Sequence, residues 1–127
     1  MKIAIYPGTF DPIKPIVGIE VYTCPDRFDK SKTEEGRRQK LNHLTLLAQN
    51  ETGYKNLLSL SALGNDPDAF YYSPRVDWGC IEKHSEGVIA LSGCLASELN
   101  QAFIKEQHDV ADSVVDRFKS VFDDRYF

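Results

Sequence analysis

The side chains best suited to metal or nucleophile chemistry are three cysteines and three histidines, and they lie far apart in the sequence. They are Cys24, Cys80, Cys94, His43, His84 and His108. No two cysteines form a C-x-x-C pair, and no histidine has His-x-His or Asp-x-His spacing. A metal site needs several such ligands within bonding distance of one ion. The spacing of these residues therefore gives no local metal-binding motif.

The composition is that of an ordinary globular domain. The chain has 127 residues, of which 42% are hydrophobic and 27% charged, and its net charge is −4. A protein that grips nucleic acid by its phosphates usually carries a basic surplus, so the charge argues against autonomous nucleic-acid binding. An odd number of widely spaced cysteines favours a reduced protein over a disulfide framework. Without a membrane-length apolar run or a signal peptide, we expect one cytoplasmic domain over residues 1–127.

Short apolar runs alternate with helix-like stretches, which is typical of an α/β domain. The predicted strands cover residues 3–6, 16–22, 41–48 and 88–91. The predicted helices cover residues 52–63, 77–84, 95–104 and 108–122, with Asp77 as an N-cap. In the last helix the predicted apolar stripe is Val110, Val114, Phe118 and Val121. The polar stretch 29–40, with Arg37, Arg38 and Lys40, is either a solvated loop or a phosphate contact.

Strand geometry places Glu20 away from the apolar side of its strand. Successive side chains of a strand point to opposite faces. Val17, Ile19 and Val21 therefore share one face, and Glu20 and Tyr22 share the less apolar one. In the next predicted strand the same rule puts Leu44, Leu46 and Ala48 on one face and His43, Thr45 and Leu47 on the other.

The opening segment Lys2-Ile3-Ala4-Ile5-Tyr6-Pro7-Gly8-Thr9-Phe10-Asp11-Pro12-Ile13 resembles the start of phosphopantetheine adenylyltransferase. In that family a strand leads into a turn whose threonine and backbone meet phosphate, so the resemblance implies an anion-binding turn at Thr9. The family's later Gly-His motif has no counterpart after Ile13. We therefore do not expect nucleotide transfer.

From Lys14 to Phe127 the chain resembles part of the PHP domain of the bacterial DNA polymerase III alpha subunit. The matching segments are residues 14–22, 43–48, 50–58, 70–72, 84–96 and 124–127, among them Lys14-Pro15-Ile16-Val17-Gly18-Ile19-Glu20-Val21-Tyr22 and Leu91-Ser92-Gly93-Cys94-Leu95-Ala96. Two resemblances in one chain predict a composite, recombined or engineered, with a junction near Ile13.

The resemblance implies a distorted (β/α) barrel with a cluster of metal ions that activate water for phosphodiester hydrolysis. By motif position it assigns Glu20 and Cys94 as metal ligands, while the family's His-x-His and Asp-x-His have no counterpart here. Glu20 is either a residual ligand or an exposed carboxylate, and Cys94 either a zinc ligand or a buried thiol. Cys24 could join Glu20 in a fortuitous site. We expect His43 and His108 to be surface residues and His84 to lie at the C-terminal end of a short helix.

The sequence thus predicts a small, mainly parallel sheet of about four strands with flanking helices, closed by oligomerisation or segment swapping. Too few ligands remain for a polynuclear metal centre, so we expect a folded fragment without autonomous catalysis and without a required cofactor. The alternative is a phosphoesterase whose zinc or manganese site is completed across an oligomer interface. No membrane partner is expected.

Overall fold

Three strands and four helices follow one another in a computed structural model that describes residues 14–31 and 40–127. The strands are β1 (Gly18–Thr23), β2 (Asn42–Ala48) and β3 (Val88–Leu91). The helices are α1 (Glu51–Gly64), α2 (Trp78–Lys83), α3 (Glu98–Ile104) and α4 (His108–Phe122), followed by the 3-10 turn η1 (Asp123–Arg125). Each of these strands and helices was predicted, with ends that differ by a few residues. The strand predicted at 3–6 lies outside the described residues.

The sheet is antiparallel, so the prediction of a mainly parallel sheet of about four strands is wrong. The strand order is β1-β2-β3, and both neighbouring pairs are antiparallel. Between β1 and β2, Glu20 lies opposite Thr45 and Tyr22 lies opposite His43. Between β2 and β3, Leu46 lies opposite Ala90.

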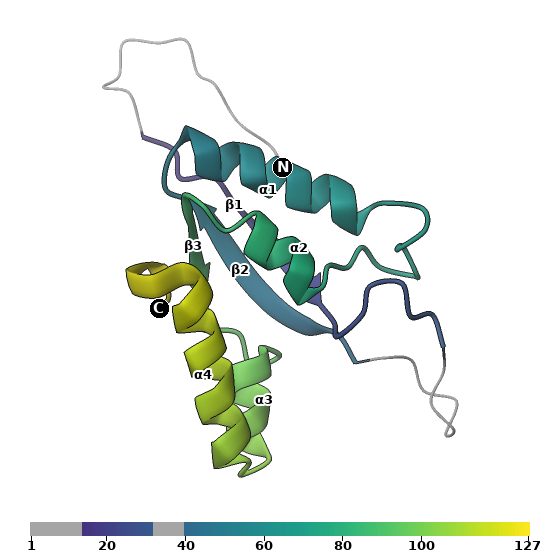
Figure 1. The fold of residues 1–127 in the computed structure, drawn as a ribbon, viewed down its shortest axis with the longest axis vertical. Coiled ribbons are helices and arrows are strands. Elements are labelled where there is room, and N and C mark those ends of the chain that lie inside the picture. Colours follow the sequence, from purple (N-terminus) through teal and green to yellow (C-terminus); the bar gives the residue numbers. More distant parts are fainter. Residues whose placement is uncertain (1–13, 32–39) are drawn as a thin grey trace.

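The number of helices between β2 and β3 explains the antiparallel direction. A single helix between two strands returns the chain to the end of the sheet at which the first strand began, so the next strand runs parallel to the first. Here α1 runs back along the sheet, and α2 then carries the chain forward again (Figure 1). β3 therefore begins beside the end of β2, where Gln49 N donates to Gly87 O at 2.8 Å. The sequence pattern revealed both helices but not this second reversal.

The core lies on one face of the sheet, beneath α1, α2 and α4. Val21, Leu44, Leu46, Val88 and Ala90 point to this face and are buried. The helices contribute Leu57, Leu60, Ile81, Val114, Phe118 and Phe122 to the same cluster. Along β2 the predicted alternation is thus confirmed. In α4 the buried stripe is Ala111, Val114, Phe118 and Phe122, while Val110 is exposed.

A close backbone approach fixes the junction between β2, α1 and β3. The Asn50 side chain caps α1 by accepting from Gly53 N at 2.9 Å. A Cβ atom on Gly53 would lie 1.8 Å from Gly87 O, so only glycine fits there. At the start of α2, Asp77 accepts from Cys80 N at 3.1 Å, which confirms the predicted N-cap.

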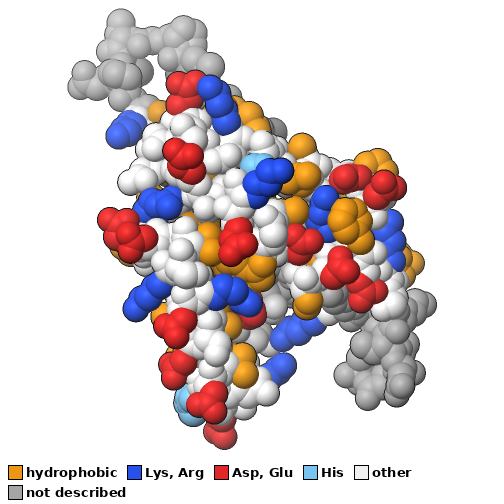
Figure 2. Space-filling view, in the orientation of Figure 1, with side chains coloured by type: hydrophobic (Ala, Val, Ile, Leu, Met, Phe, Trp, Pro, Cys, Tyr) orange, Lys and Arg blue, Asp and Glu red, His pale blue; other side chains and the backbone are white. Residues whose placement is uncertain are grey.

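Each outer strand is touched by one extended segment that runs parallel to it. Val76 bridges Thr23 beside β1, and Tyr126 bridges Ala90 beside β3. Acidic and basic side chains are interspersed on the face shown in Figure 2, with no continuous basic area. Within residues 14–31 and 40–127, no helix combines the length and apolar character needed to cross a membrane.

Candidate metal centre

The face of the sheet opposite the core carries Glu20, Tyr22, His43 and Thr45. Strand alternation places Glu20 and Tyr22 on the same side of β1. Tyr22 lies directly across from His43, and the two ring centroids are 4.8 Å apart. These polar side chains are exposed or only partly buried, and no helix in the described part of the chain lies over this side of β1 and β2 (Figure 1).

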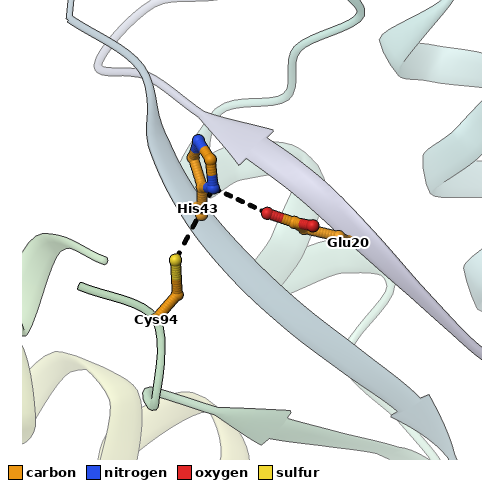
Figure 3. A group of neighbouring side chains, drawn as sticks. All are labelled: Glu20, His43 and Cys94. Carbon is orange, nitrogen blue, oxygen red and sulfur yellow. Dashed lines mark hydrogen bonds and ion pairs between the residues drawn. The ribbon is translucent and has the colours of Figure 1, made fainter. Parts of the chain in front are cut away.

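Three potential metal ligands converge at the His43 end of this face (Figure 3). Glu20 Oε1 lies 2.6 Å from His43 Nδ1. Cys94 Sγ lies 3.6 Å from the same nitrogen. One donor atom from each of the three residues lies within 4.8 Å of the others. We call these three residues the triad.

Cys94 reaches the triad from the loop that follows β3, and hydrogen bonds hold this loop in place. Cys94 O accepts from Ser97 N at 2.8 Å and from Asn100 Nδ2 at 2.9 Å. His43 N donates to Ala96 O at 3.1 Å, which ties the loop to the first residues of β2. The position of the thiol is therefore set by α3 and β2 together.

The chemistry of the triad fits zinc better than a hard cation. A carboxylate oxygen, an imidazole nitrogen and a thiolate sulfur are all zinc ligands, and zinc accepts three protein ligands with a fourth position open. Tetrahedral zinc bonds imply donor separations of about 3.3 to 3.6 Å. The Cys94–His43 distance of 3.6 Å meets this requirement. The Glu20–His43 distance of 2.6 Å is shorter than this range, and the Glu20 side chain, 53% exposed, has room to move.

The structure brings Glu20 and Cys94 together and adds His43, which sequence reasoning had assigned to the surface. The missed signal is the strand register. Once β1 and β2 are recognised as antiparallel neighbours, Tyr22 faces His43, and Glu20 follows two residues away on the same face. Assuming a parallel sheet concealed this proximity.

The other sequence candidates lie elsewhere. Cys24 is buried, its Sγ lies 3.6 Å from Val76 O, and burial raises its pKa to about 11. Burial also raises the pKa of Cys80. His84 caps the C-terminus of α2 as predicted, and its Nδ1 lies 2.8 Å from Cys80 O. His108 begins α4 and is exposed. Thr9, Arg37 and Arg38 lie outside the described residues.

Comparison with known proteins agrees with the second resemblance. The chain is 39% identical over 118 residues to the DNA polymerase III subunit alpha of Deinococcus radiodurans and 40% identical over 116 residues to that of Thermus aquaticus. Each alignment covers 91% of this chain and 9% of the relative. The chain thus spans about a tenth of the length of the curated relatives it matches. A family model described as PHP domain matches residues 2–127. The chain belongs to the PHP domain family.

Proposed function

We propose that this chain is a segment of a DNA polymerase III alpha-type PHP domain that binds one zinc ion through the triad and has no hydrolytic activity alone. The convergence of Glu20, His43 and Cys94 within 4.8 Å carries this proposal. The sequence similarity to DNA polymerase III alpha subunits supports the assignment to that kind of domain.

The absence of autonomous hydrolysis rests on the number of ligands. Among the described residues, the triad is the one group of three or more His, Cys, Asp or Glu side chains arranged to hold a metal ion. Three ligands leave a single ion with an open position, whereas two-metal hydrolysis requires a second ion about 4 Å away. The other ligands of a polynuclear centre would come from chain segments other than those described.

The side chains of the triad have separate tasks in this proposal. His43 presents Nδ1 toward both partners, and contact with the Tyr22 ring limits how the imidazole can rotate. Glu20 neutralises positive charge at the site and stays accessible to water. A bound zinc ion would polarise a phosphate oxygen and lower the pKa of a coordinated water.

Calorimetric titration with zinc tests the proposal. We expect one zinc per chain for the wild type, and His43→Ala should weaken binding at least tenfold because it removes the central ligand. His84→Ala is the matched control, since His84 lies at the end of α2. Equal affinities for wild type and His43→Ala would refute the site. Hydrolysis of bis-p-nitrophenyl phosphate by the zinc-loaded protein, abolished in Cys94→Ala, would refute the inactive assignment.

A second candidate function is phosphodiester hydrolysis at a site completed by another copy of the chain. The exposed position of Glu20 and the uncovered sheet face support it, because ligands of a partner subunit could approach there. This candidate requires a homo-oligomer, and its activity per subunit must rise with protein concentration. Manganese- and zinc-dependent turnover measured across the dissociation range would test it. Activity that stays at background in a proven oligomer would exclude it.

We also propose a separate origin for the first thirteen residues, on the strength of the literal adenylyltransferase-like run that contains Thr9. The PHP family model extends to residue 2 and therefore includes this segment, so the two descriptions overlap. A residual anion-binding turn would release heat on titration with ATP, and Thr9→Ala would remove it. Identical heats of ATP titration for the wild type and Thr9→Ala would show that Thr9 does not bind the nucleotide and would contradict this proposal.

A further inference from the structure

Arg75 is a buried cation whose hydrogen-bonding capacity is only partly used. Only 3% of the residue is exposed. Its Nε donates to Ala69 O at 3.1 Å, while its Nη2 is buried and has no acceptor. Among the described residues no carboxylate lies within 4.0 Å of it; its guanidinium faces the Tyr71 ring at 5.4 Å. A buried charge is stabilised when it is paired and hydrogen-bonded, and within the described residues Arg75 has no partner of opposite charge.

A hollow of about 200 Å³ adjoins this side chain, between the outer edge of β1 and the last turns of α1. Arg75, Ser61 and Asn65 form the polar part of its lining. The apolar part comes from Leu60, Pro74 and Val76. Ligand pockets for drug-sized molecules are about 300 to 1,000 Å³, so this hollow suits a smaller ligand. Several water molecules would fill it.

The edge of β1 adds backbone groups to the hollow. Val76 N donates to Tyr22 O, and Cys24 N donates to Val76 O, so Tyr22 and Cys24 turn their backbone groups toward this edge. Because alternate residues of a strand point their N–H groups the same way, the N–H of Glu20 is directed to the same edge. Glu20 lines the hollow too, but its carboxylate is turned toward His43 (Figure 3).

We propose that this hollow is a binding site for a small tetrahedral oxyanion of the phosphate class. The guanidinium of Arg75 supplies the charge, and the Ser61 hydroxyl and the Glu20 backbone N–H supply hydrogen-bond donors. A phosphate ion would give Arg75 the missing counter-charge. The inference does not depend on the triad, because no metal ligand other than Glu20 takes part, and that residue only through its backbone.

A purely structural role for Arg75 makes the opposite prediction. The C-terminus of a helix attracts cations, and Arg75 N donates to Gly64 O in the last turn of α1. If Arg75 served only to hold this loop, its stabilising effect would be independent of the anion in solution. The two roles therefore differ in their response to phosphate.

The test is thermal unfolding of the full chain in EDTA, with phosphate compared against chloride at equal ionic strength. For the wild type we expect phosphate to raise Tm by about 8 °C when its concentration exceeds the dissociation constant thirtyfold, and we expect the rise to grow with the logarithm of the phosphate concentration. Arg75→Met should lose this rise. Ser61→Trp, at an exposed position of α1, should block the hollow, leave Tm in chloride nearly unchanged and lose the phosphate effect as well. Lys83→Met, on α2, is the control that should keep it.

Deoxyadenosine monophosphate distinguishes the source of the anion. Stabilisation by both inorganic phosphate and the nucleotide, lost in Ser61→Trp, would assign the hollow to a terminal phosphate group. Stabilisation by inorganic phosphate alone would assign it to the free ion. The proposal is overturned if phosphate raises Tm no more than chloride does, or if Ser61→Trp responds like the wild type. Should Arg75→Met fail to fold, Ser61→Trp decides.

Discussion

The two faces of the sheet differ in what covers them. On one face Leu44, Leu46 and Ala90 are buried beneath helices. On the other, Glu20, His43 and Thr45 of β1 and β2 stay at least partly exposed, and no helix among residues 14–31 and 40–127 packs over them. Burial of apolar surface stabilises the first face, and the second is free to carry polar groups that a core would exclude. The residues that stabilise the fold and the candidate metal ligands therefore lie on opposite faces of the same sheet.

The largest expected effect comes from shortening a leucine on the covered face of β2. Leu46→Ala should lower the free energy of unfolding by about 2 to 5 kcal/mol, because Leu46 is fully buried and the change leaves a cavity. Leu47→Ala, the next residue, points to the open face and should cost less than about 1 kcal/mol. Urea denaturation measures both. Equal losses in the free energy of unfolding for the two variants would show that side chains on the open face are also tightly packed.

Thiol labelling sharpens the same contrast at three positions. In the native protein Cys94, in the partly exposed loop after β3, should react rapidly with Ellman's reagent, while the buried Cys24 and Cys80 react only as fast as the chain opens. The raised pKa of both buried thiols further lowers their thiolate fraction. Cys94→Ala should remove the fast phase, and zinc should slow it in the wild type. A fast phase that survives Cys94→Ala would contradict this assignment.

A pH dependence of stability is expected on the covered side. Burial raises the pKa of Cys24 from 9.0 to about 11, so the folded chain holds this proton where the unfolded chain has lost it. The stability from the neutral thiol is complete below pH 9 and should be lost progressively as pH rises from there to about 11. Cys24→Ala should make the decline between these values shallower, although Cys80 still contributes. Chemical denaturation at several pH values would show it, and an unchanged slope would contradict it.

Periodicity predicted the elements well because each depends on its own residues. The alternation in β2 separated Leu44 and Leu46 from His43 and Thr45 correctly. Strand direction could not be predicted in this way, since the pattern shows that two helices lie between β2 and β3 but not the direction in which each runs along the sheet. In α4 the prediction was right for Val114 and Phe118, but Val110 is exposed and Ala111 and Phe122 are buried, with Val121 only partly buried against the core, because the packing partners set the final rotation of a helix.

Only part of the candidate site was predicted, because one of its residues depends on strand pairing. Glu20 and Cys94 were recognised by motif position, which does not require knowledge of the pairing of strands. His43 became visible only through the β1–β2 register, which places Tyr22 opposite it. Arg75 was missed entirely, because its sequence context indicates a turn and nothing local reveals that its side chain is buried. Residues that act through long-range contacts need the fold before they can be identified.

Cobalt substitution tests the open face most directly. If Glu20, His43 and Cys94 bind one ion, Co²⁺ added to the reduced protein should produce a thiolate-to-cobalt charge-transfer band that saturates at one equivalent. Zinc should displace it, Cys94→Ala should abolish it and His43→Ala should weaken binding at least tenfold, while His108→Ala leaves it unchanged. The absence of a charge-transfer band, or an equally strong band in Cys94→Ala, would contradict the metal centre.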